Sequence, residues 1–175
     1  MTTAAPRRNG DKPFIITRTF KAPRALVWRA WTDPKELVKW FGPKGSSIAK
    51  CTMDLRPGGI FHYLMLTADG IEMWGKWIFQ EVVAPEKLVL IQSFSDAQGG
   101  ITAHPFAPTW PRETWSRTTF SEHAGTTTIE VHWTVWNGTD EEHATFDGAH
   151  GGMTQGWGGT MDRLTDYLAA QPANA

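Results

Sequence analysis

Hydrophobic and polar residues alternate along most of the chain between residues 47 and 136, which is the period of β-strands. In the run 128–135, every second residue is Ile, Val or Trp, and the residues between them are Thr, Glu or His. Short turns rich in Gly and Pro separate such runs, so we expect consecutive strands to pair in antiparallel fashion. The pattern predicts strands at 14–20, 48–55, 60–67, 71–84, 87–95, 114–121 and 126–136.

Near the amino end the period becomes helical twice. Four apolar residues within 22–31 share one helical face, and Pro23 stands near the start, where proline is tolerated. Asp33 can cap a second short helix, because Pro34 suits its first position and Glu36 completes the spacing of a capping box. Both helices are short, so we expect them to depend on packing against the sheet.

The run from Thr139 to Leu168 predicts one long amphipathic helix, opened by a capping box of Thr139 and Glu142. Six glycines interrupt it, and each costs about 1 kcal/mol relative to alanine in a helix. We therefore expect packing to hold this helix, and the glycines to let sheet or ligand come close. On this hypothesis Gly152→Leu or Gly156→Leu harms binding or folding. The apolar stripe comprises Phe146, Met153, Trp157, Met161 (or Thr160), Leu164 and Leu168.

The order of strand, two helices, six strands and long helix predicts an α+β domain over residues 14–170, with a disordered leader at 1–13 and a tail at 171–175. The net charge of −1 and the lack of a basic cluster argue against nucleic acid. No apolar run reaches the roughly 20 residues that span a bilayer, so we expect no membrane insertion and a cytoplasmic location. The single Cys51 cannot form an internal disulfide and is read as a buried apolar residue.

Several short motifs follow one another along the chain: Ala22-Pro23-Arg24, Val27-Trp28, Trp31-Thr32-Asp33-Pro34, Trp40-Phe41-Gly42-Pro43, Asp54-Leu55-Arg56-Pro57-Gly58-Gly59, Pro85-Glu86-Lys87-Leu88 and Gly156-Trp157 with Leu164. Together and in this order they resemble the SRPBCC (START-like) superfamily, in the branch homologous to the activator of the heat-shock-90 ATPase (Aha-type). The resemblance implies the helix-grip fold, in which a seven-stranded antiparallel sheet curls around a long carboxy-terminal helix and encloses a cavity. Members bind lipids, polyketides, hormones or flavonoid-like molecules, and some are cyclases or hydrolases.

The chain has ten tryptophans and two tyrosines, and such large rings need a deep core or a concave site. Core packing and a ring-lined cavity both account for them, and the resemblance favours the cavity. Alternation places every second side chain of a strand on the inner face. In the predicted strand 60–67, Phe61, Tyr63 and Met65 are chosen as the inward set over His62, Leu64 and Leu66. The candidate ligand-binding residues between sheet and helix are Phe61, Tyr63, Met65, Trp77, Phe79, Trp133, Met153 and Trp157.

The segment 94–112 has no period and predicts a long loop that could cover the cavity. Phe94 and Trp110 are added to the candidate site on this ground, and Asp96 and His104 could meet as a carboxylate–imidazole pair. In the alternative reading, which we favour, Asp96 caps a turn and His104 binds backbone. His150 is read as an interior histidine with satisfied hydrogen bonds.

No metal-binding, phosphate-binding or nucleophile motif is present, so the sequence predicts neither a metal nor a cofactor, and it identifies no catalytic residue. We expect the protein to bind a small, mainly hydrophobic or aromatic ligand. Two alternatives stay open: a cyclase- or hydrolase-like enzyme using the same cavity, and a module that interacts with a heat-shock-90-type chaperone. The oligomeric state is open too, a homodimer included.

Overall fold

The computed structural model describes residues 11–172, so residues 1–10 of the predicted leader and 173–175 of the predicted tail lie outside it. Within the described part, no helix is both long and apolar enough to cross a membrane. The elements are β1 (Phe14–Phe20), α1 (Arg24–Thr32), α2 (Pro34–Leu37), β2 (Ser47–Met53), β3 (Ile60–Leu66), β4 (Glu72–Val83), β5 (Lys87–Ser95), β6 (Ile101–Thr102), β7 (Thr114–His123), β8 (Thr126–Val135), α3 (Asp140–Gly148) and α4 (His150–Ala169).

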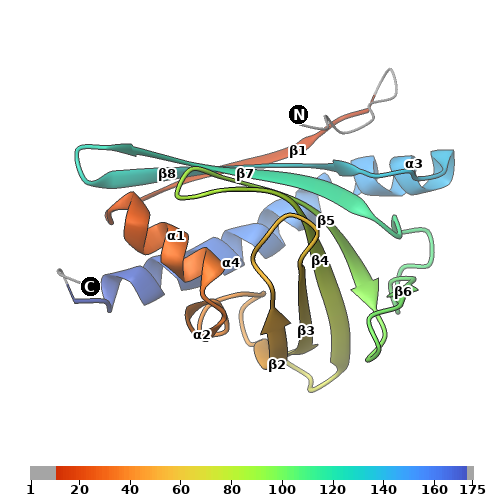
Figure 1. The fold of residues 1–175 in the computed structure, drawn as a ribbon. Coiled ribbons are helices and arrows are strands. Elements are labelled where there is room, and N and C mark those ends of the chain that lie inside the picture. Colours follow the sequence, from red (N-terminus) through yellow and green to blue (C-terminus); the bar gives the residue numbers. More distant parts are fainter. Residues whose placement is uncertain (1–10, 173–175) are drawn as a thin grey trace.

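All strands join one antiparallel sheet in the order β1-β8-β7-β5-β4-β3-β2, and the two-residue β6 adds to β5 as an eighth strand. The sheet curves around α4, and α1 and α2 lie between the two edge strands, β1 and β2 (Figure 1). This is the helix-grip arrangement, so the predicted α+β class is confirmed. The estimate of about seven strands misses only β6, which is too short to show a period in the sequence.

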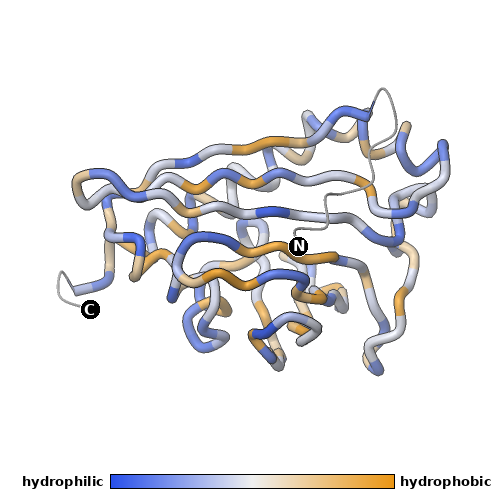
Figure 2. The backbone as a smooth tube through the Cα atoms, turned by 45° about the horizontal axis from the view of Figure 1, so that its top comes forward, coloured by the Kyte–Doolittle hydropathy of each residue, from blue (hydrophilic) through white to orange (hydrophobic). Residues whose placement is uncertain are grey.

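The inner face of the sheet carries the core. Ile129, Val131 and Val135 are buried on β8, as the alternation predicts, and Trp77 and Phe79 are buried on β4. Figure 2 shows hydrophobic and hydrophilic positions alternating along the strands. These observations confirm the predicted orientation of both strands.

One residue of β3 departs from this rule. Alternation leaves Leu64 off the inner face, yet its side chain is only 4% exposed. It pairs with Trp74 of β4, and a separate cluster of Val89, Ile91 and Trp115 is buried on β5 and β7. The outer face therefore buries side chains of its own, which alternation along a single strand cannot reveal.

The prediction of one long carboxy-terminal helix is wrong in one respect, because the segment forms two helices that meet at Ala149. The capping box of Thr139 and Glu142 is present at the start of α3. Ala149 closes that helix, with its N–H donating to the carbonyl of Phe146. Gly148 and the glycines that open α4 lower helix propensity on both sides of this junction, which favours a break there.

The proposed role of the glycines is also wrong for four of the five in α4, since only a Cβ on Gly159 would meet another segment, at 3.5 Å from Cγ of Lys44. A Cβ placed on Gly151, Gly152, Gly156 or Gly158 would meet no atom of the described residues within 4 Å, apart from neighbouring residues and nearby helix backbone. An added side chain at these positions would therefore point into open space, and none of the four glycines lines the cavity. The opposite face of α4 is buried through Met153, Thr160, Met161, Leu164 and Leu168.

Two polar contacts join α2 and the segment after it to α4. Asp33 caps α2 by accepting from the N–H of Lys35 at 2.9 Å, but Glu36 does not complete the expected capping box. Its carboxylate instead accepts from the Tyr167 hydroxyl of α4. About one turn before Tyr167 in α4, Nη1 of Arg163 donates to the carbonyls of Gly42 at 3.0 Å and Pro43 at 3.1 Å. These bonds fix the position of Phe41, which the next subsection places in the site.

Candidate functional site

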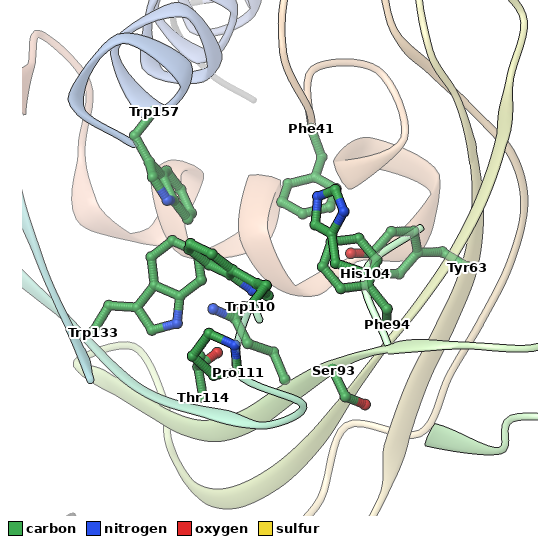
Figure 3. Close-up of a pocket in the computed structure, with 11 residues that line it drawn as sticks. Phe41, Tyr63, Ser93, Phe94, His104, Trp110, Pro111, Thr114, Trp133 and Trp157 are labelled. Atoms are coloured by element: carbon green, nitrogen blue, oxygen red, sulfur yellow. The ribbon is translucent and has the colours of Figure 1, made fainter. Parts of the chain in front are cut away.

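A cavity of about 240 Å³ lies between the inner face of the sheet, α4 and the segment before β7 (Figure 3). Six aromatic rings from separate parts of the chain form most of its wall, and histidine, proline and small polar residues complete it. The lining residues are Phe41, Tyr63, Gln92, Ser93, Phe94, His104, Trp110, Pro111, Thr114, Trp133 and Trp157.

The sheet forms one wall, and its geometry follows from strand pairing. Gln92 of β5 lies opposite Thr114 of β7, so both side chains leave the same face of the sheet. On β4, Gly75 pairs with Tyr63 on one side and Phe94 on the other. A Cβ on Gly75 would lie 2.5 Å from Cζ of Tyr63. The missing side chain therefore lets the Tyr63 ring lie across the sheet at the cavity wall.

The opposite wall is a chain of rings in contact. Trp157 of α4 stacks on Trp31 with 6.3 Å between ring centroids, and it meets Trp133 of β8 edge-on at 6.1 Å. The ring centroid of Trp110 lies 6.1 Å from that of Trp133 and 5.7 Å from that of Phe146 in α3. Each ring is braced by another, so this wall is largely formed before any ligand enters.

The segment 94–112 is more ordered than the sequence suggested. Its first two residues belong to β5, and Ile101–Thr102 form β6. Oδ1 of Asp96 accepts from the N–H groups of Gln98 at 2.9 Å and Gly100 at 2.8 Å. Nδ1 of His104 accepts from the N–H of Phe106 at 3.0 Å. Asp96 thus caps a turn outside the cavity lining, and the carboxylate–imidazole pair is not formed.

Among the described residues that line the cavity, none is Asp, Glu, Lys or Arg. Burial lowers the pKa of His104, which therefore favours its neutral form. Because Nδ1 accepts a hydrogen bond, the proton of that neutral ring is on Nε2. Burial also raises the pKa of Tyr63, an effect that the Trp77 indole partly offsets, so the phenol keeps its proton. Near neutral pH the wall therefore carries no ionised group.

Of the residues predicted for the site, the structure places Tyr63, Phe94, His104, Trp110, Trp133 and Trp157 around the cavity. The other predicted residues lie elsewhere. Phe61, Trp77 and Phe79 are buried in the core, Met65 packs against that core, and Met153 is buried beside Phe146.

Sequence reasoning missed Phe41, Gln92, Ser93, Pro111 and Thr114. Gln92 gave a usable signal, since it interrupts the apolar run of β5 at a position that alternation places inward. Phe41 lies outside the regular elements, so no period could place it.

A serine–histidine pair on the outer side of the sheet has the distance of a catalytic dyad. Nε2 of His62 lies 3.1 Å from Oγ of Ser95 and also 3.1 Å from the carbonyl oxygen of Asp96. A carbonyl oxygen only accepts, so Nε2 carries a proton and acts as a donor. His62 in this state cannot take the proton of Ser95, and the pair supports no hydrolase mechanism.

Two further observations bear on other site types. Within residues 11–172, no group of three or more His, Cys, Asp or Glu side chains could hold a metal ion. His150 packs edge-on against Phe14 and Phe146, but its Nε2 is buried with no hydrogen-bond partner. The prediction of satisfied hydrogen bonds at His150 is therefore wrong for Nε2, because the ring packs among apolar aromatic side chains that offer no acceptor or donor of their own.

Comparison with known proteins agrees with this architecture. No curated protein matches the chain significantly. Among solved structures, protein Ms6760 from Mycobacterium smegmatis is 25% identical, with 97% of this chain and 98% of that chain covered and a TM-score of 0.76. Protein NE0264 from Nitrosomonas europaea is 26% identical, with coverages of 90% and 94% and a TM-score of 0.71. The AHSA1 protein from Silicibacter pomeroyi is 17% identical, with coverages of 90% and 98% and a TM-score of 0.66.

The family model AHSA1, described as activator of Hsp90 ATPase homolog 1-like protein, matches residues 21–169. That range runs from just before α1 to the end of α4, so it includes every element that contributes to the cavity. The chain therefore belongs to the family of activator of Hsp90 ATPase homolog 1-like proteins, in the SRPBCC branch that its motifs resemble.

Proposed function

We propose that the protein binds a small, mainly aromatic molecule in the cavity between the sheet and α4. The observation that carries this proposal is the wall of six aromatic rings, Phe41, Tyr63, Phe94, Trp110, Trp133 and Trp157, around about 240 Å³ of space. The family supports a hydrophobic ligand-binding fold in general. Closely packed rings that leave room at their centre are typical of a ligand site.

The volume limits the size of the ligand. An apolar cavity of about 150 Å³ accepts benzene, whereas sites for drug-sized molecules have about 300–1,000 Å³. At about 240 Å³, the cavity suits one or two fused rings. A ring system of that size buries ~150–250 Å², which contributes ~4–6 kcal/mol at 25 cal/mol per Å² before the cost of association. We therefore expect weak binding that needs titration to high ligand concentration.

The enzyme and chaperone alternatives have less support. The only titratable side chains of the wall are His104 and Tyr63, whose ordinary roles in acid–base catalysis need a partner that the wall does not supply. A chaperone role rests on the name of the matched family, and its test is the ATPase rate of a heat-shock-90 chaperone with and without the protein. A cytoplasmic location stays a prediction.

Quenching of tryptophan fluorescence by a panel of one- and two-ring compounds tests the proposal, because three tryptophans line the cavity. The variant Thr114→Leu extends an apolar side chain from the sheet into the cavity and should weaken binding. Thr119→Leu makes the same change on the outer face of the same strand and should leave binding unchanged. If no compound changes the fluorescence, or if both variants weaken binding equally, the proposal fails.

A further inference from the structure

The cavity contains an amide side chain that the protein itself does not use. Gln92 lies between Trp77 and Thr114 in the sheet pairing, and both neighbours are buried on the inner face. Its side chain lines the cavity. None of the described residues forms a hydrogen bond with this amide. Gln80 on β4 provides a contrast, since it is exposed and its amide donates to the carbonyl of Ile78.

A polar group on an inner face costs free energy unless something bonds to it. An apolar residue of similar length would pack against the surrounding rings without that cost. In the free protein, water in the cavity can bond to the amide of Gln92. The amide therefore forms no hydrogen bond that supports the fold, and it is available to a ligand that replaces this water.

The amide also determines what kind of ligand edge fits. It presents an N–H donor beside a C=O acceptor in one plane, and it pairs best with a flat edge that carries an acceptor beside a donor. Glutamine reads the edge of adenine in this two-bond manner. The hydroxyl of Thr114, directly opposite on β7, adds a further polar group to the same wall.

The uncharged wall disfavours ligands that carry a carboxylate or an ammonium group. A carboxylate or ammonium group would lose its hydration in the cavity, and no side chain of opposite charge lines the wall. The proton on Nε2 of His104 adds a neutral donor to this wall. One exception is a quaternary ammonium group, because aromatic faces attract such a cation without a carboxylate.

We infer that the ligand is a flat, uncharged compound of one or two rings whose edge carries a hydrogen-bond acceptor beside a donor, such as a lactam fused to an aromatic ring. Gln92 is the specificity-determining residue, and the aromatic rings supply the apolar contact. This inference rests on the proposed function, since it names the ligand class of the same cavity.

Calorimetric titration with three compounds of similar shape tests the inference. 2-Quinolinone carries both the acceptor and the donor, N-methyl-2-quinolinone has only the acceptor, and naphthalene has neither. Two hydrogen bonds of about 1 kcal/mol each predict that 2-quinolinone binds about 30-fold more tightly than naphthalene, with the N-methyl compound between them. In Gln92→Met, which keeps the side-chain length, this preference should disappear while naphthalene still binds. Gln80→Met, on exposed β4 surface, should retain the preference.

A second readout does not depend on the variant. In a ¹H–¹⁵N spectrum of the unaltered protein, 2-quinolinone should shift the side-chain NH₂ signals of Gln92, and naphthalene should shift them less. Equal affinity for 2-quinolinone and naphthalene would overturn the inference and leave the proposed function intact. Tightest binding of a naphthyl-trimethylammonium ion would overturn it in favour of an aromatic cage for cations. Failure of every compound to bind would remove both the inference and the proposed function.

Discussion

The glycines of α4 distinguish two accounts of this helix: one in which they make room for a ligand, and one in which they only lower helix propensity. If the helix were thinned to admit a ligand, adding side chains there would reduce binding. The structure instead leaves open space around a Cβ at Gly156 and Gly158, apart from neighbouring residues and nearby helix backbone. Each Gly→Ala change then removes the helix penalty of glycine, about 1 kcal/mol, with no packing term in either direction.

The double variant Gly156→Ala/Gly158→Ala should therefore gain about 2 kcal/mol of unfolding free energy, if the two changes add. For a chain of 175 residues, that gain raises the Tm by about 4–8 °C. Circular dichroism gives the Tm, and fluorescence quenching gives the ligand affinity, which should not change. An unchanged or lower Tm, or a loss of affinity in a folded variant, would refute the reasoning. Gly75→Ala is the matched control, because its Cβ would lie 2.5 Å from the Tyr63 ring and should lower both stability and affinity.

Two further predictions concern contacts that join α4 to the segment carrying Phe41. The hydrogen bond from Tyr167 is the main cause that holds the pKa of Glu36 below its ordinary value of 4.5, and the hydrogen bond from Lys39 is the second. A lowered carboxyl pKa stabilises the fold above that ordinary value and loses this effect as the pH falls through the lowered pKa. Tyr167→Phe should lower the free energy of unfolding by about 1 kcal/mol near pH 7, as measured by urea unfolding. This difference from the unaltered protein should shrink in acid, and a difference that is constant with pH would contradict the reasoning. Arg163→Lys keeps the charge but loses the fixed geometry of the guanidinium that holds the backbone next to Phe41. Phe41 should then be held less firmly in the cavity wall, and the ligand affinity should fall several-fold. Unchanged affinity would show that Phe41 is held by its other contacts.

The parts of the fold that follow from the spacing of hydrophobic residues along the chain could be predicted from the sequence. Strands β1 and β5 begin and end at the predicted residues, because alternation and turn residues define both ends. The capping box at Thr139 also follows from residue types three positions apart. The break at Ala149 was not predictable, since glycines on both sides lower helix propensity without saying where packing gives way.

The candidate site was harder, because it is a property of several elements together. Trp157 and Trp133 could be placed on facing surfaces by period alone, and the structure brings both to the cavity. Phe61 and Trp77 share the predicted inner face, yet they fill the core. Alternation tells which face a side chain occupies but not whether another element covers it. Phe41 reaches the cavity through an irregular segment held by Arg163, a contact between residues more than 100 positions apart.

The indole N–H signals of the ten tryptophans test the central claim most directly, once each is assigned by a Trp→Phe variant. A ligand in the cavity should shift the signals of Trp110, Trp133 and Trp157, which line it. The signals of Trp74 and Trp115, which lie on the outer face of the sheet, should stay in place. Shifts confined to these outer tryptophans, or no shifts with any compound of the panel, would contradict a ligand site between the sheet and α4.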